Sequence, residues 1–157
     1  MHKIMIGGGT VLLMLGTALA AEEAKIDLSA VPAAVMETAT KEASGFEASS
    51  ANTEMEDGKK IYEIQGMADG KTVEVDVMED GTLDEVETIV EMSAVPEAVN
   101  KAILAKMPNF KSAKVEESKR TDALYYEIEG ADGSNKMEVE IKADGSGMKS
   151  EKMDGAS

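Results

Sequence analysis

The residues of this chain that could carry out chemistry are almost all carboxylates. The sequence has 31 aspartates and glutamates against 16 lysines and arginines, no cysteine, and a single histidine, His2. The lack of cysteine excludes a thiol nucleophile, a thiolate metal ligand and a disulfide framework. His2 lies in a segment that we expect to be removed, so the commonest general base is absent too. Carboxylate pairs are the remaining candidates for acid and base catalysis.

The candidate pairs lie on segments in which polar and apolar residues alternate. Glu74 and Asp76 form one pair, and Glu138 and Glu140 form another. A catalytic carboxylate needs burial to shift its pKa, and alternation places these side chains on the polar, solvated side of a strand. We therefore predict that the protein is not an enzyme and has no catalytic residue, cofactor-binding residue or cofactor.

Metal binding is the next chemistry that so many oxygen ligands suggest, because hard cations such as Ca²⁺ prefer them. The loop 76–81 lacks the alternating donors of an EF-hand, and 132–135 is more simply a turn. We predict no discrete metal site, and leave open weak, diffuse binding of divalent cations. The nine methionines after the first twenty residues are scattered, which favours core filling over a copper-binding surface.

The first twenty residues have the pattern of a secretory signal peptide. Lys3 supplies the positive charge, residues 11–15 the apolar stretch, and Ala18-Leu19-Ala20 a cleavage motif before Ala21. We expect a periplasmic or secreted protein that is free of the membrane after cleavage. The remaining chain has 15 basic and 31 acidic residues, a formal charge of −16, which excludes nucleic acid as a default partner.

The sequence after the signal peptide repeats itself at an offset of 64 residues. Ser29-Ala-Val-Pro-Ala-Ala-Val35 returns as Ser93-Ala-Val-Pro-Glu-Ala-Val99, Tyr62-Glu-Ile64 as Tyr126-Glu-Ile128, and Asp80-Gly81 as Asp144-Gly145. A self-match in constant register indicates two copies of one structural unit. We predict tandem repeats over 26–89 and 90–153.

Each repeat combines a helical pattern with patterns of period two. Apolar residues at 95, 98, 99, 102 and 103 share one helix face. Pro32 and Pro96 should lie in the first turns, with Ser29 and Ser93 as caps. The segments 62–65, 73–77 and 137–141 alternate as strands, and Asp-Gly pairs separate them. The predicted class is α+β, each repeat being a helix on an antiparallel meander of three to four strands. Whether the two meanders form one continuous sheet stays open.

The second copy also resembles a known family. The stretch Val95-Pro-Glu-Ala-Val99 leading to Ala105-Lys-Met-Pro-Asn-Phe110, then Tyr125-Tyr-Glu-Ile-Glu129, Met137-Glu-Val-Glu-Ile141 and Asp144-Gly145, is similar to the PepSY-like family. The resemblance implies a fold like that of beta-lactamase-inhibitor protein and a role in binding, inhibiting or chaperoning exported proteins. This chain lacks the family's tryptophan, and no peptidase domain follows, so inhibition would act in trans.

If Tyr62, Ile64, Val73 and Val75 face the helices, the opposite sheet face is acidic and carries an exposed aromatic residue. A solvated surface is one interpretation of this face. The interpretation that we prefer is a docking surface for another exported protein. The alternatives are an acidic calcium- or cation-binding protein and a trans-acting inhibitor of a secreted peptidase. The predicted docking residues are Ile61, Glu63, Gln65, Glu74, Asp76, Tyr125, Glu127, Glu129, Glu138 and Glu140.

Overall fold

The computed structural model describes residues 24–56 and 58–153, so the predicted signal peptide 1–20 lies outside the described residues. Over these residues the protein is α+β, as predicted, with two α-helices and one antiparallel sheet of nine strands in sequential order. The question that the sequence left open is answered, because a single sheet runs through the whole described chain. The strands are β1 (Ala24–Ile26), β2 (Glu47–Glu56), β3 (Lys59–Ala68), β4 (Lys71–Met78), β5 (Leu83–Ile89), β6 (Phe110–Arg120), β7 (Leu124–Asp132), β8 (Asn135–Lys142) and β9 (Lys149–Lys152).

The helices α1 (Ala33–Glu42) and α2 (Glu97–Lys106) each begin one residue after a proline. Pro32 and Pro96 are the N-cap residues and not part of the first turn. The prediction that serines cap the helices is wrong, since neither helix has a side-chain cap bond in the described structure. A short 3₁₀ helix precedes each one, over Leu28–Ala30 (η1) and Met92–Ala94 (η2), and the expected cap residues lie within these turns.

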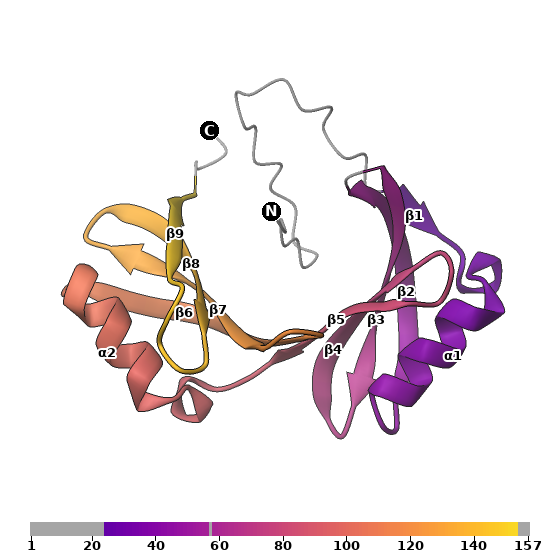
Figure 1. Cartoon of the computed structure of the whole chain (residues 1–157), viewed down its shortest axis with the longest axis horizontal. Coiled ribbons are helices and arrows are strands. Elements are labelled where there is room, and N and C mark those ends of the chain that lie inside the picture. Colours follow the sequence, from indigo (N-terminus) through magenta and orange to yellow (C-terminus); the bar gives the residue numbers. More distant parts are fainter. Residues whose placement is uncertain (1–23, 57, 154–157) are drawn as a thin grey trace.

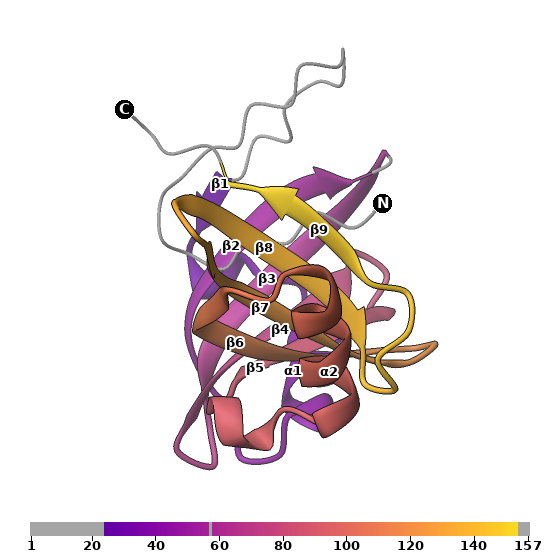
Figure 2. The same ribbon diagram turned by 90° about the vertical axis from the view of Figure 1, so that its left-hand side faces the viewer.

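Both helices pack against the same face of the sheet. Figure 1 shows α1 and α2 on the outer side of a curved sheet, and Figure 2 shows α2 in front of β6, β7 and β8. Two apolar clusters lie beneath them. Val35, Ile64 and Val75 are fully buried in the first, and Val99 and Ile128 in the second. Burying such side chains stabilises the fold by about 1.5–3 kcal/mol each.

A glycine on β3 and another on β7 let a neighbouring strand and an aromatic ring approach closely. A Cβ added at Gly66 would lie 2.2 Å from the carbonyl oxygen of Glu47 and 2.8 Å from the Phe46 ring. A Cβ added at Gly130 would lie 2.4 Å from the carbonyl oxygen of Lys111. No larger residue fits either position without moving backbone, which explains the two glycines that the sequence spaces 64 residues apart.

The pairing of β5 with β6 joins the first half of the sheet to the second. Its register runs from Glu85 opposite Arg120 to Ile89 opposite Glu116. Because directly opposite residues project from the same face of a sheet, this joint places side chains from both halves side by side.

Candidate functional site

The candidate site is the sheet face opposite the helices, on the inner side of the curve in Figure 1. We call it the inner face. Cross-strand register lines its side chains up in rows, and carboxylates outnumber basic groups in them. One row is Glu63, Asp76, Glu85 and Arg120; the next is Gln65, Glu74, Glu87, Ser118, Tyr125 and Lys142; the third is Ile89, Glu116, Glu127, Glu140 and Lys149; the last is Lys114, Glu129, Glu138 and Glu151.

The ten predicted docking residues all lie on the inner face, but four of them are buried and not open to solvent as expected. The buried ones are Ile61, Glu63, Glu74 and Glu127, at 3–4% exposure, and the others, Gln65, Asp76, Tyr125, Glu129, Glu138 and Glu140, are partly buried. The reason is geometric, because side chains on four or more adjacent strands of a sheet that curves toward them cover one another. The sequence argument that nothing would bury these carboxylates fails for the same reason.

Arg120 lies at the centre of the inner face and is the only arginine in the sequence. Its side chain is 9% exposed and donates to three carboxylates: Nε to Glu85 Oε2 at 2.6 Å, Nη2 to Glu127 Oε1 at 2.6 Å, and Nη1 to Glu140 Oε2 at 2.9 Å. The hydroxyl of Ser118 donates to the same oxygen of Glu85 at 2.6 Å. One guanidinium thus ties β5 of the first half to β7 and β8 of the second.

A single arginine does not neutralise the carboxylates around it. Glu87 is 1% exposed, and its Oε1 has no hydrogen-bond partner in the described chain. The same holds for Glu127 Oε2 and Asp76 Oδ1. Burial, and then the charge of Glu127, raises the pKa of Glu87 well above its ordinary value. Burial, and then the charge of Glu74, raises the pKa of Asp76. The centre of the inner face therefore holds more carboxyl groups than its basic residues can pair, and Glu87 and Asp76 favour their protonated forms.

The second half of the face is better compensated toward its edge. Lys114 pairs with Glu116 at 2.9 Å, and Lys149 pairs with Glu140 at 2.7 Å. Burial also acts on Glu140, but hydrogen bonds from Lys149 and Arg120 outweigh it and lower the pKa.

Glu138 forms no ion pair with a basic residue within 24–56 and 58–153. Burial, and then the charge of Glu151, raises its pKa to about 7. Glu129 on β7, Glu116 on β6 and Glu140 on β8 add to the negative charge that faces it.

The aromatic residue of the predicted surface, Tyr125, lies close to two cations. The Arg120 guanidinium lies 4.5 Å and the Lys142 ammonium 5.5 Å from the centre of the Tyr125 ring. Its hydroxyl donates to Asp122 Oδ2 at 3.0 Å. The Tyr125 ring therefore packs against the Arg120 guanidinium and helps to hold it in position.

Sequence reasoning missed the residues at the middle of the face: Glu85 and Glu87 on β5, and Glu116, Ser118 and Arg120 on β6. Their alternation was readable, since Glu85 and Glu87 flank Val86, and Ser118 and Arg120 flank Lys119. The signal that was not readable is the pairing of β5 with β6, which joins residues 27 to 35 positions apart.

The arrangement concentrates desolvated oxygen donors and little positive charge in one place. Such a surface can bind what neutralises it, namely protons, hard metal cations, or the ammonium and guanidinium groups of a protein.

No protein-family model matches the chain, and no curated protein matches it. Solved structures do. A BLIP-like (beta-lactamase-inhibitor-like) protein from Bacteroides fragilis superposes with a TM-score of 0.63 at 17% identity, over 80% of this chain and 89% of that one. A DUF2874 family protein from Bacteroides uniformis gives 0.61 at 18% identity, over 77% and 88%. A candidate periplasmic protein from Bacteroides eggerthii gives 0.61 at 17% identity, over 78% and 88%.

These similarities define the class of protein as one with a BLIP-like fold. The likeness is one of fold, so the PepSY-like resemblance stays a prediction. Among the described helices, none is both long and apolar enough to span a bilayer.

Proposed function

We propose that this protein is an exported, non-enzymatic binding module, built from two tandem repeats over 26–89 and 90–153, that docks another exported protein through its inner face. The observation that carries the proposal is the row-by-row excess of carboxylates over basic groups on a single continuous face. A periplasmic or secreted location, after cleavage before Ala21, follows from the signal-like N-terminus. It agrees with the candidate periplasmic protein of the same fold.

The chemistry of the face favours a basic partner. A lysine or arginine that enters the inner face replaces lost hydration with charge-assisted hydrogen bonds to carboxylates whose charge is already costly. The negative field of the whole chain would steer such a partner toward it, which makes the association rate sensitive to salt. Inhibition of a secreted peptidase in trans is a special case of this docking, in which the bound protein is the peptidase.

The experiment is capture of partners from the exported fraction of the source cells with two charge-matched double variants. The inner-face variant is Glu129→Gln with Glu138→Gln. The control is Glu79→Gln with Glu97→Gln, both exposed and outside the inner face. The capture is made at pH 8.5, above the raised pKa of Glu138, so each variant removes close to two negative charges and general electrostatic attraction falls about equally in both.

We expect a partner that the native protein and the control retain at low salt and that the inner-face variant loses. The same partner should dissociate at high salt, and its exposed surface should be rich in lysine or arginine. Equal retention by both variants, or no partner at either salt, would overturn the docking proposal.

A further inference from the structure

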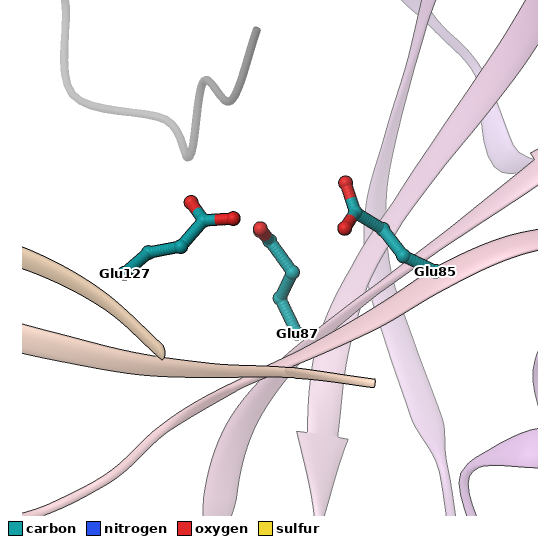
Figure 3. A group of neighbouring side chains, drawn as sticks. All are labelled: Glu85, Glu87 and Glu127. Atoms are coloured by element: carbon teal, nitrogen blue, oxygen red, sulfur yellow. The ribbon is translucent and has the colours of Figure 1, made fainter. Parts of the chain in front are cut away.

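Three carboxylates from two strands converge at the centre of the inner face. Glu85 and Glu87 lie on β5 and Glu127 on β7, and each offers a carboxylate oxygen within 4.8 Å of the other two. All three are buried, at 4%, 1% and 4% exposure. Figure 3 shows the three side chains pointing toward one another, with the Glu87 carboxylate between those of Glu85 and Glu127.

Some carboxylate oxygens of the three glutamates accept hydrogen bonds, and others have no donor among the described residues. Arg120 and Ser118 both donate to Oε2 of Glu85, and Arg120 donates to Oε1 of Glu127. Oε2 of Glu127 and Oε1 of Glu87 are buried without a partner in the described chain. A buried carboxylate oxygen without a donor is costly, so a cation that these two oxygens could bind would stabilise the cluster.

The chemistry of the three carboxylates indicates which kind of ion could bind between them. Every ligand is a carboxylate oxygen, which suits hard divalent cations and not the softer metals that take sulfur or imidazole. The ligands of Ca²⁺ lie at about 2.3–2.6 Å from it, so two of them are separated by up to about 5 Å; those of Mg²⁺, at about 2.0–2.1 Å, are separated by up to about 4.2 Å. The spacing of the glutamates fits within the span of the larger ion.

We propose that Glu85, Glu87 and Glu127 form a discrete Ca²⁺ site, with Ser118 and Arg120 orienting Glu85 and Glu127 as ligands. The ion bridges β5 and β7 across β6, and so links the two halves of the sheet at their joint. This site does not depend on the docking partner of the proposed function. It replaces the diffuse binding that the sequence left open with three named ligands.

The test is calorimetric titration of the purified protein, freed of metal, with Ca²⁺, together with thermal unfolding in CaCl₂ against NaCl of equal ionic strength. We expect one Ca²⁺ per chain, with a Kd of about 10⁻⁵–10⁻³ M. At ten times the Kd, the melting temperature should rise by about 3–6 °C beyond the salt control. Mg²⁺ should bind at least tenfold more weakly.

Two single variants decide where the ion binds. Glu87→Gln removes the central ligand while keeping the size of the side chain, and should abolish both the heat of binding and the calcium-dependent rise. Because glutamine keeps the size of the side chain and cannot ionise among the neighbouring carboxylates, the melting temperature of the variant without calcium should equal or exceed that of the native protein, which excludes misfolding as the cause. Glu138→Gln replaces another carboxyl group of the inner face in the same way and should keep calcium binding.

Three results would overturn the proposal. One is a rise in melting temperature no larger than that in NaCl, which would leave protons as the occupants of the cluster. Another is equal loss of binding in Glu87→Gln and Glu138→Gln, which would indicate diffuse attraction. The third is Mg²⁺ binding as tight as that of Ca²⁺. None of these results bears on whether the inner face docks a protein.

Discussion

Replacing Arg120 tests the claim that this side chain compensates the buried charge of the inner face. Arg120→Met keeps an unbranched apolar stem and removes the guanidinium, with its charge and its three donated bonds to Glu85, Glu127 and Glu140. Removing one partner of a buried ion pair costs about 3–5 kcal/mol, because the other partner stays buried and uncompensated. With 9% of the Arg120 side chain exposed, little solvent is available to reduce that cost.

The loss is a large part of the 5–15 kcal/mol that holds a typical domain folded. With a urea dependence of about 2 kcal/mol per molar, it moves the unfolding midpoint down by roughly 1.5–2.5 M. The assay is urea unfolding at pH 7.5 with a chelator present, so that no cation substitutes for the arginine. Lys119→Met is the matched control, since the neighbouring Lys119 side chain is 62% exposed and pairs with Glu42 at 3.6 Å; its loss should stay within about 0.5 kcal/mol.

The loss of stability in Arg120→Met should be smaller at acidic pH, because the glutamates that have lost their partner can then take up protons and lose their charge. A loss below about 1 kcal/mol at pH 7.5, or one that does not change with pH, would refute the reasoning. It would mean that water, and not Arg120, stabilises these carboxylates.

Two further predictions concern packing and protonation. Gly130→Ala should destabilise the fold by about 1–3 kcal/mol in thermal or urea unfolding, because the added Cβ meets the Lys111 carbonyl oxygen at 2.4 Å. Gly133→Ala, with a φ of 62° but no atom within 4 Å of the added Cβ, should lose only about 1 kcal/mol, and equal losses would contradict the close approach. Glu138, whose pKa is raised to about 7, stabilises the fold when protonated, and that contribution is lost as the pH rises from about 4.5 through 7. The unfolding midpoint of Glu138→Gln, relative to that of the native protein, should therefore rise between pH 4.5 and pH 8. A difference in midpoint that stays constant over this range would contradict the raised pKa of Glu138.

Much of the fold could be predicted because its signals are local. The helix around Val99 and Ile103 follows from residues three and four apart, and strand β8 follows from strict alternation over 137–141. Strand β1 spans three residues, which is too short for any periodic signal. The single sheet could not be predicted either, since the joint between Glu85 and Arg120 depends on a pairing that no local pattern marks.

The candidate site, like the fold, could be predicted only where local sequence patterns mark it. Alternation placed Glu74 and Glu138 on the correct face, but it assigns a polar residue to solvent by default. Burial of Glu87 arises from neighbours on adjacent strands and from the curvature of the sheet, which are properties of the assembled structure. The single arginine gains its importance from position, because three strands bring carboxylates to its guanidinium.

The two ends of the described sheet affect how the protein behaves at high concentration. A strand at the end of a sheet exposes backbone groups that can pair with another chain and start aggregation. Here β1 offers three residues, Ala24–Ile26, and β9 offers four, Lys149–Lys152, of which three are charged. Short ends with lysines resist the addition of a further strand, so a sheet of nine strands is protected against growing into a fibril.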